Sequence, residues 1–226
     1  MKKITFFAVL LCLCTCMRGN AQKSNIILSI EGAPSVRWLT GNKVLKEFNH
    51  PTLGFYGGVT AQIPLSARWS IVTGGGFEHK GSVAKFEVTD FNAAVIGKAS
   101  VYNNLDYLTI PVLIRASFGN KIKYYFNAGC YYGGLWAANS TTDDPNNLRS
   151  HTKKEDNISI IQSSDFGLSI GGGVRVQLTP KWTIPIEIRS NHGVINTSKV
   201  PIVNNGSIKT NATNLIVGLS YEFGKP

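Results

Sequence analysis

The sequence predicts an all-β fold, a closed antiparallel up-and-down transmembrane β-barrel of about eight strands. Eight segments alternate apolar and polar residues with the two-residue period of a strand, and no segment has a convincing helical period. The connections between these segments alternate strictly between tight and long. Only 16% of the 226 residues are charged, and after the first twenty-odd residues no apolar run is long enough for a spanning helix. These observations exclude a disordered chain and a helical membrane protein.

The chain begins with a predicted secretory signal peptide, residues 1–21, which precedes one barrel domain over residues 22–226. The signal opens with two lysines, continues with the apolar run 4–13 and ends in the small residues 19–21. The apolar run is too short for a membrane anchor, and the residues before Cys16 are a poor lipidation motif. Cleavage is therefore favoured over both alternatives.

Cleavage leaves Cys130 as the one cysteine of the mature chain, which excludes an internal disulfide and a Cys/His zinc cluster. Of the 23 Lys and Arg residues, three lie in the signal, so the mature chain has 20 basic against 13 acidic residues. A basic excess suits an anionic neighbour such as lipid headgroups or lipopolysaccharide, and export disfavours nucleic acid.

The predicted strands cover most of the mature chain. They lie at residues 25–38, 53–63, 69–78, 106–118, 122–137, 165–178, 182–193 and 212–223. Alternation is clearest in the fourth strand and in the last three. Apolar residues occupy the even positions of 108–118, of 166–176 apart from Gly172 and of 182–188, and then the odd positions of 215–223.

The connections between the strands have two lengths. Tight turns are predicted at residues 64–68, 119–121 and 179–181, and long loops at 39–52, 79–105, 138–164 and 194–211. Because alternate connections of an antiparallel meander emerge at the same end, the tight turns and both termini share one end and the long loops share the other. Outer-membrane barrels have this asymmetry, with short turns on the periplasmic side. An up-and-down soluble barrel such as a lipocalin can also show it.

The polar faces of the strands favour a membrane barrel over a soluble one. They consist mostly of Gly, Ser, Thr, Asn and Tyr, whereas solvated surfaces carry more lysine and more charge. Four acidic and four basic residues are predicted to face inward and to pair in a narrow lumen: Glu31, Glu78, Glu187, Glu222, Arg37, Arg115, Arg175 and Arg189. Lysines concentrate instead in the loops and turns.

Aromatic residues gather near the strand ends, as amphipathic rings do at the two membrane interfaces. Near the tight turns these are Trp69, Tyr124, Trp182 and Tyr221, and toward the long loops they are Trp38, Tyr132 and Trp136. The alternative interpretation is that these rings belong to an ordinary core.

Five motifs resemble the PorT-like outer-membrane β-barrel family, the small exported barrels of gram-negative bacteria. They are YLTIPVLI at 107–114, GNK at 119–121, YFNAG at 125–129, DFGLSIGGGV at 165–174 and VGLSYEF at 217–223. The resemblance spans most of the mature chain and is clearest from residue 105 onward. Its motifs mark strands and turns, so the resemblance implies the fold and the outer membrane but transfers no catalytic residue and no role in secretion.

Ser190 and His192 are the one pair that suggests catalysis, because residues two apart on a strand share a face. Nucleophilic catalysis also needs a third group that orients the base, and the sequence identifies none. We therefore expect no catalytic residue.

Metal and phosphate sites are not predicted either. His50, His79 and His151 lie in or beside different loops without metal-ligand spacing, and the glycine runs 74–76 and 171–173 precede no helix. Glycine in these strands suits a narrow barrel or the crossing of a lumen side chain. Residues 143–147 could bind calcium, although a solvated loop tip is favoured. No metal and no cofactor is expected.

These observations predict a small outer-membrane barrel without enzymatic activity, monomeric, with a lumen plugged by side chains and a structural or surface-interaction role in its long loops. Outer-membrane lipid, lipopolysaccharide and a protein partner at the loops are the expected partners. Residues 79–105 extend a hairpin beyond the membrane, or else form two further spanning strands. The alternative functions are a secreted lipocalin-like barrel that binds an apolar ligand and an outer-membrane lipid hydrolase.

Overall fold

The computed structural model describes most of the mature chain. The described residues are 25–89, 95–120, 122–143, 153–202 and 206–224. The predicted signal peptide, His151 and most of the candidate calcium loop lie outside them. Within the described ranges, no helix is long and apolar enough to cross a membrane.

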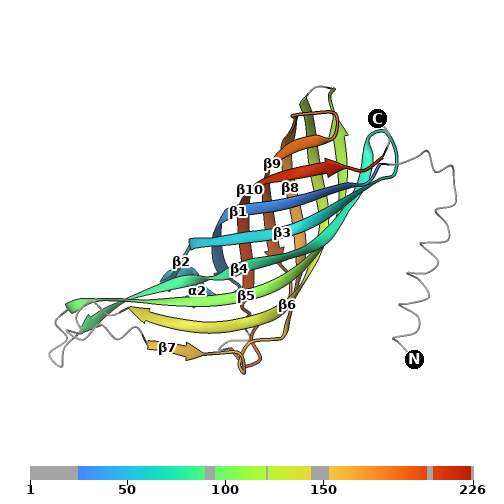
Figure 1. The fold of residues 1–226 in the computed structure, drawn as a ribbon. Helices are drawn as coiled ribbons and strands as arrows, with labels where there is room; N and C mark the ends of the chain where they lie inside the picture. Colours follow the sequence, from blue (N-terminus) through green and yellow to red (C-terminus); the bar gives the residue numbers. More distant parts are fainter. Residues whose placement is uncertain (1–24, 90–94, 121, 144–152, 203–205, 225–226) are drawn as a thin grey trace, which may run out of the picture.

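Eight antiparallel strands close into a ring (Figure 1). They are β1 (Ile27–Thr40), β3 (Thr52–Pro64), β4 (Trp69–Thr89), β5 (Val95–Phe118), β6 (Ile122–Asp143), β8 (Ser164–Gln177), β9 (Trp182–Gly193) and β10 (Lys209–Glu222). Each strand pairs with the next one of this series. The eight predicted strands are confirmed, with shifted boundaries.

The ring closes where the first strand meets the last. β1 pairs with β10 from Ile27 opposite Glu222 to Thr40 opposite Lys209. A closed ring has no free edge within the barrel, so its backbone N–H and C=O groups are paired. This satisfies the requirement that hydrocarbon imposes on any chain that spans it.

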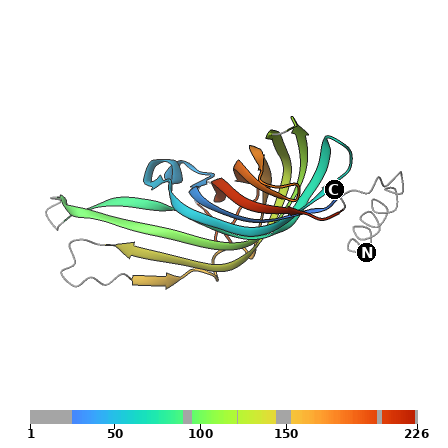
Figure 2. The same cartoon turned by 45° about the horizontal axis from the view of Figure 1, so that its top comes forward.

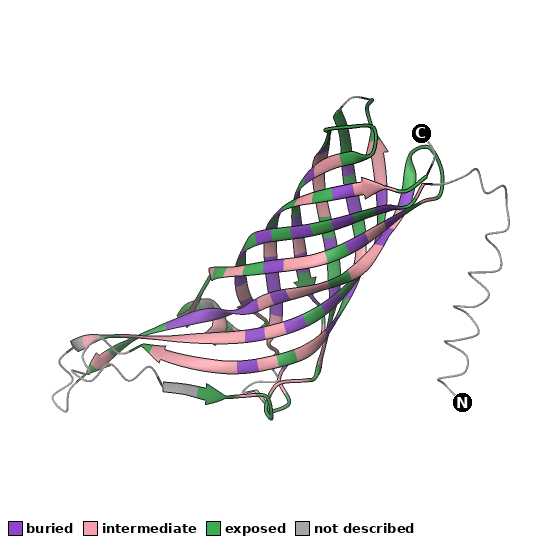
Figure 3. Ribbon diagram, viewed as in Figure 1, coloured by how far each residue is buried: buried purple, intermediate pink, exposed green. Residues whose placement is uncertain are grey.

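The side chains of the barrel are arranged inside out relative to a soluble protein. Along β1, Ile30 is 69% exposed on the outer face, whereas its neighbour Glu31 is 6% exposed in the lumen. Figure 3 shows the same alternation of buried and exposed bands along the other barrel strands. A lipocalin-like barrel would bury its apolar face. Here the apolar face points outward and the lumen is polar, so the lipocalin-like alternative is wrong.

Three strands continue past the barrel at the long-loop end. Beyond Glu78, β4 loses its pairing with β3 and runs on as a hairpin with β5, and β6 follows β5. The short strands β2 (Asn49–His50) and β7 (Lys153–Asp156) flank this sheet on β4 and β6. We call the five-stranded extension β2-β4-β5-β6-β7 the outer sheet; Figures 1 and 2 show it projecting from one side of the barrel.

The outer sheet decides what residues 79–105 form. The described parts, 79–89 and 95–105, extend a hairpin, as one of the two predicted alternatives stated, and do not add two spanning strands to the ring. A β-bulge lies where the outer sheet begins. Tyr107 pairs with Leu135 and Asp106 with Ala137, so Trp136 is the extra residue of β6. Bulges bend the strand that contains them, which suits a strand leaving the rim of a barrel.

One helix contradicts the expectation of none. α2 (Lys43–Phe48) lies in the connection between β1 and β2, and the side chain of Asn42 caps it by accepting a 2.8 Å hydrogen bond from the Leu45 amide. Six residues make fewer than two turns, so the segment is too short to show a helical period in the sequence.

Candidate functional site

The middle of the lumen is closed by a cluster of charged side chains. Arg189 Nε lies 2.7 Å from Glu187 Oε1, and Arg115 Nη2 lies 3.1 Å from Glu187 Oε2. Arg189 also approaches Glu31 at 3.6 Å, and Asn127 donates to Glu187 over 2.8 Å. Each of these five side chains is at most 6% exposed. The predicted pairing of inward Glu and Arg residues is confirmed here.

A second cluster lies nearer the outer sheet and centres on a lysine. Lys80 is fully buried, with its Nζ 2.9 Å from Asp165 Oδ2, 3.5 Å from Glu78 Oε2 and 3.9 Å from the ring centre of Tyr131. Thr210 also donates to Asp165, over 2.6 Å. The ammonium group is therefore held between two carboxylates and an aromatic face, an arrangement that offsets part of its desolvation.

Arg37 joins the barrel to the outer sheet. Its guanidinium donates to the carbonyl oxygens of Leu53, Lys80 and Asn103 and to the side chain of Asn104. These acceptors lie on β3, β4 and β5, at the level where β4 leaves β3. One buried side chain thus fixes the base of the outer sheet.

Tyrosines fill the space between the charged groups, and glycines make room for them. A Cβ atom built on Gly76 would lie 2.6 Å from the Tyr56 ring, and one built on Gly167 would lie 2.5 Å from the Tyr131 ring. The expected use of glycine, to let lumen side chains cross, is confirmed at these positions. Together with the two clusters, the rings support a plugged lumen.

Two details of the lumen differ from the sequence interpretation. Glu222 lies at the rim, half-buried, where Asn25 donates to it over 2.9 Å, and it does not join the central cluster. The sequence pattern predicts a loop around Lys80, yet Lys80 is a fully buried lumen residue at the centre of the second cluster. A signal for it existed, since Glu78 and Lys80 share one face of a strand.

Ser190 and His192 lie together on the outer face of β9, as their spacing predicts. Ser190 Oγ is 3.0 Å from His192 Nε2, and His192 Nδ1 is 3.1 Å from Asn211 Oδ1 on β10. Asn211 donates in turn to Thr40 over 3.0 Å. The orienting group that sequence reasoning did not find is therefore present. It was missed because the sequence pattern predicts a loop at Asn211, whereas β10 begins at Lys209.

The histidines and acids of the long-loop end do not converge. His50 is exposed on β2, and the side chains of His79 and Asp106 form a hydrogen bond across β4 and β5. Asp143, the one described residue of the candidate calcium loop, is exposed at the end of β6. In the described part of the chain, no three His, Cys, Asp or Glu side chains are placed to hold a metal ion.

Aromatic side chains occupy both rims of the barrel. At the tight-turn end, the rings of Trp182, Tyr221 and Phe223 form edge-to-face pairs, with centroids 4.8 and 4.7 Å apart. At the long-loop end, Trp38 makes a similar contact with His192 over 6.3 Å. The band between them carries exposed aliphatic residues, so the predicted membrane-interface arrangement agrees with the structure.

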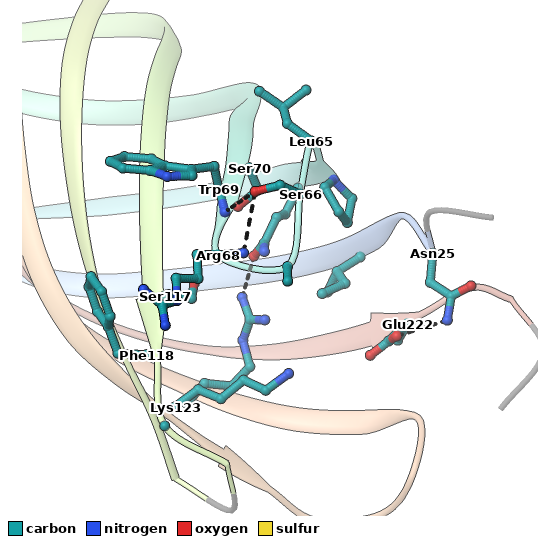
Figure 4. Close-up of a pocket in the computed structure, with 16 residues that line it drawn as sticks. Asn25, Leu65, Ser66, Arg68, Trp69, Ser70, Ser117, Phe118, Lys123 and Glu222 are labelled. Carbon is teal, nitrogen blue, oxygen red and sulfur yellow. Dashed lines mark hydrogen bonds between the residues drawn. The ribbon is translucent and has the colours of Figure 1, made fainter. Parts of the chain in front are cut away.

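A cavity of about 530 Å³ opens at the tight-turn end of the lumen. We call it the turn-end cavity; its lining includes Asn25, Gln62, Arg68, Ser70, Lys123, Arg175 and Glu222. Figure 4 labels several of these side chains, among them Arg68, Ser70 and Lys123, and shows the Asn25–Glu222 pair at one edge. Gln62 accepts hydrogen bonds from both Arg115 and Arg175, so it links the cavity to the central cluster.

Comparison with known proteins agrees with this architecture. A family model described as outer membrane protein beta-barrel domain matches residues 20–199. No curated protein matches.

Solved structures of several outer-membrane proteins are similar at low sequence identity. Ail of Yersinia pestis, solved with the heparin analogue sucrose octasulfate, is 14% identical over 88% of this chain and 99% of its own, with a TM-score of 0.41. Neisserial surface protein A is 12% identical over 87% and 97%, with a TM-score of 0.47. A major outer membrane protein of Thermus thermophilus is 16% identical over 88% and 99%, also with a TM-score of 0.47.

Proposed function

Because this chain belongs to the outer membrane protein beta-barrel domain family and is an outer-membrane protein, we propose that it acts at the cell surface through its outer sheet, without enzymatic activity. The lumen, filled by the two charged clusters, serves as a rigid anchor rather than a conduit. Outer-membrane lipid and lipopolysaccharide surround the protein, which works as a monomer. Membership of the PorT-like branch stays a prediction from the sequence.

The unequal strand lengths carry this proposal. A spanning strand needs about 9–11 residues, which β9 (Trp182–Gly193) closely matches. β4, β5 and β6 are 21, 24 and 22 residues long. At about 3.3 Å per residue, β4 extends roughly 35 Å past Glu78, where it leaves β3. A sheet of this length adds nothing to the closure of the barrel, so its use lies outside the membrane.

Side chains on the outer sheet support contact with a protein partner. Trp136 is 67% exposed at the bulge and lines a groove of about 410 Å³ with Asn139, Asp156 and Ile158. On β4, the ring of Phe86 is exposed and packs against Phe48 of α2, with centroids 6.4 Å apart. Exposed aromatic rings beside polar groups are typical of protein interfaces.

A shortened variant tests the proposal. Ser82 pairs with Asn103, so the two can be joined by an Asn-Gly turn in place of residues 83–102. The variant should still fold, as judged by migration before and after boiling. A photo-crosslinking residue at Phe86 should give a discrete protein adduct in cells, whereas one at Leu168 on the lipid face should not. The proposal fails if the photo-crosslinking residue at Phe86 gives no protein adduct in cells.

Ser190, His192 and Asn211 form a chain of hydrogen bonds that we call the Ser190 relay. This relay favours a second candidate function, hydrolysis of lipid esters. Asn211 Nδ2 donates to Thr40, which turns Oδ1 of Asn211 toward His192. With Nδ1 donating to that oxygen, Nε2 of His192 is free to accept the Ser190 proton. Nucleophile, base and orienting group thus follow one another along the hydrogen bonds as they do in serine hydrolases. The three side chains lie on the outer face of the barrel, from which lipid can approach.

A serine-directed fluorophosphonate probe tests this second candidate. The refolded parent should be labelled, and Ser190→Ala and His192→Ala should abolish labelling and the hydrolysis of a phospholipid ester. Ser198→Ala, in a loop remote from the relay, is the matched control. An unlabelled parent removes the hydrolase candidate and leaves the first proposal intact.

A further inference from the structure

The turn-end cavity is a blind vestibule whose use the proposed function does not explain. It opens at the tight turns, which face the periplasm in outer-membrane barrels. Its inner wall includes Gln62, whose side chain accepts hydrogen bonds from Arg115 and Arg175. Its volume of about 530 Å³ lies in the usual range of small-molecule sites. The plugged lumen closes its inner end, so it can hold a ligand but cannot conduct one.

The charges around the turn-end cavity are mainly positive. Arg68, Lys123 and Arg175 line it, against the single described acidic residue Glu222. Glu222 is already engaged, because Asn25 donates to it over 2.9 Å. Lys123 and Arg68 are exposed at the mouth, while Arg175 is 7% exposed near the inner wall. This distribution favours an anionic ligand that enters past the lysine and reaches the buried arginine.

Two buried donors in the turn-end cavity have no protein partner. Ser70 is 3% exposed, and its hydroxyl makes no hydrogen bond within the described structure. Arg175 donates to Gln62 through one terminal nitrogen, while its Nε–H is buried without an acceptor. Leaving such donors unpaired is costly, so buried polar groups are nearly always satisfied. Both belong to the lining of the same cavity, in which Figure 4 labels Ser70.

We propose that the turn-end cavity is a periplasmic binding site for the oxoanion of a small polar molecule, either a carboxylate or a phosphate. The planar guanidinium of Arg175 contributes its free Nε–H, the Ser70 hydroxyl donates a second hydrogen bond, and Lys123 supplies charge at the mouth. Arginine suits both oxoanions because its donors match their geometry. The barrel would then carry a ligand site on the side of the membrane opposite the outer sheet.

Anion titration of the refolded full-length mature protein tests this site. The probes are inorganic phosphate, triglycine with a free carboxylate and triglycine amide, which distinguish the two oxoanions and control for the peptide. Isothermal titration calorimetry of the protein in detergent measures the binding. At least one of the two anions should give a saturable change, and triglycine amide should give none.

Substitutions locate the binding groups. Arg175→Gln should weaken binding about tenfold or more, as expected for a lost charged hydrogen bond. Lys123→Gln, at an exposed position, should weaken it less and lower its dependence on salt. Lys85→Gln, exposed on the outer sheet, makes the same charge change remote from the cavity and should have no effect. No saturable response to either anion, or equal effects of Lys123→Gln and Lys85→Gln, overturns the proposal.

Discussion

The buried lysine of the lumen offers a sharp test of how the barrel is held together. In Lys80→Met the chain keeps a side chain of similar length but loses the only cation that contacts both Glu78 and Asp165 among the described residues. Two carboxylates would then remain in a lumen where each is fully buried. We expect the variant to fold less stably because an uncompensated buried charge is strongly unfavourable.

The contacts set the expected magnitude. Removing one partner of a buried pair costs about 3–5 kcal/mol. Asp165 keeps its hydrogen bonds from Tyr131 and Thr210, and Glu78 keeps those from two asparagines. These remaining donors place the loss near the lower end, at about 3 kcal/mol. Adding Asp165→Asn to Lys80→Met removes one of the unpaired charges and should recover part of the loss.

Equilibrium unfolding in urea, with the protein inserted in lipid vesicles and followed by tryptophan fluorescence, measures this difference. Lys85→Met is the matched control, since Lys85 lies on the same strand but is exposed. The control should stay within about 0.5 kcal/mol of the parent. If Lys80→Met lies within about 1 kcal/mol of the control (roughly a fivefold change in the unfolding equilibrium), or the double variant is no more stable than the single one, the reasoning is refuted.

Four further predictions concern the barrel as a whole. Gly76→Ala should lose about 1–3 kcal/mol in the same assay through its clash with a lumen tyrosine, whereas Gly75→Ala, with nothing within 4 Å, should be nearly neutral. Ile170→Arg on the lipid face should cost about 2–4 kcal/mol, and Phe86→Arg on the outer sheet far less; equal costs would contradict the membrane span. The protein should fractionate with the outer membrane and migrate differently on gels before and after boiling, and a detergent-free soluble form would contradict this. Mass spectrometry of the mature protein should find its first residue at Gln22, and an intact signal would refute cleavage.

Much of the barrel could be predicted because its physics is local and repetitive. An apolar residue facing lipid and a small or polar residue facing the lumen must alternate on every strand, so the period is visible without knowledge of the fold. The same alternation predicts the inward Glu31, Arg37, Glu187 and Arg189, all of which are buried in the lumen. Alternation alone does not give the direction of the apolar face, because it is the same for soluble and membrane barrels. The composition of the polar faces and the sorting of tight and long connections predicted that the apolar face meets lipid, and the structure confirms this.

The features that were missed depend on contacts distant in sequence. Lys80 is interpretable as a lumen residue only if β4 continues past Glu78, and that continuation depends on pairing with β5 rather than on a strong local pattern. The bulge at Trp136 then changes which positions of β6 face inward, so a single period cannot describe the strand. Asn211 reaches His192 only through the pairing of β9 and β10. Each of these needs the register between strands, which a single sequence does not state.

The two short strands at the margins of the outer sheet, β2 and β7, limit its pairing with neighbouring copies in the membrane. A long exposed strand edge would invite a neighbouring copy to pair with it and form a chain of molecules along the surface. β2 occupies part of the β4 edge, and β7, with the sequence Lys-Lys-Glu-Asp, occupies part of the β6 edge. Such a charged strand is a poor template for further pairing. Neighbouring barrels can therefore pack closely in the membrane without edge-to-edge strand pairing. A partner molecule would bind to the faces of the outer sheet instead.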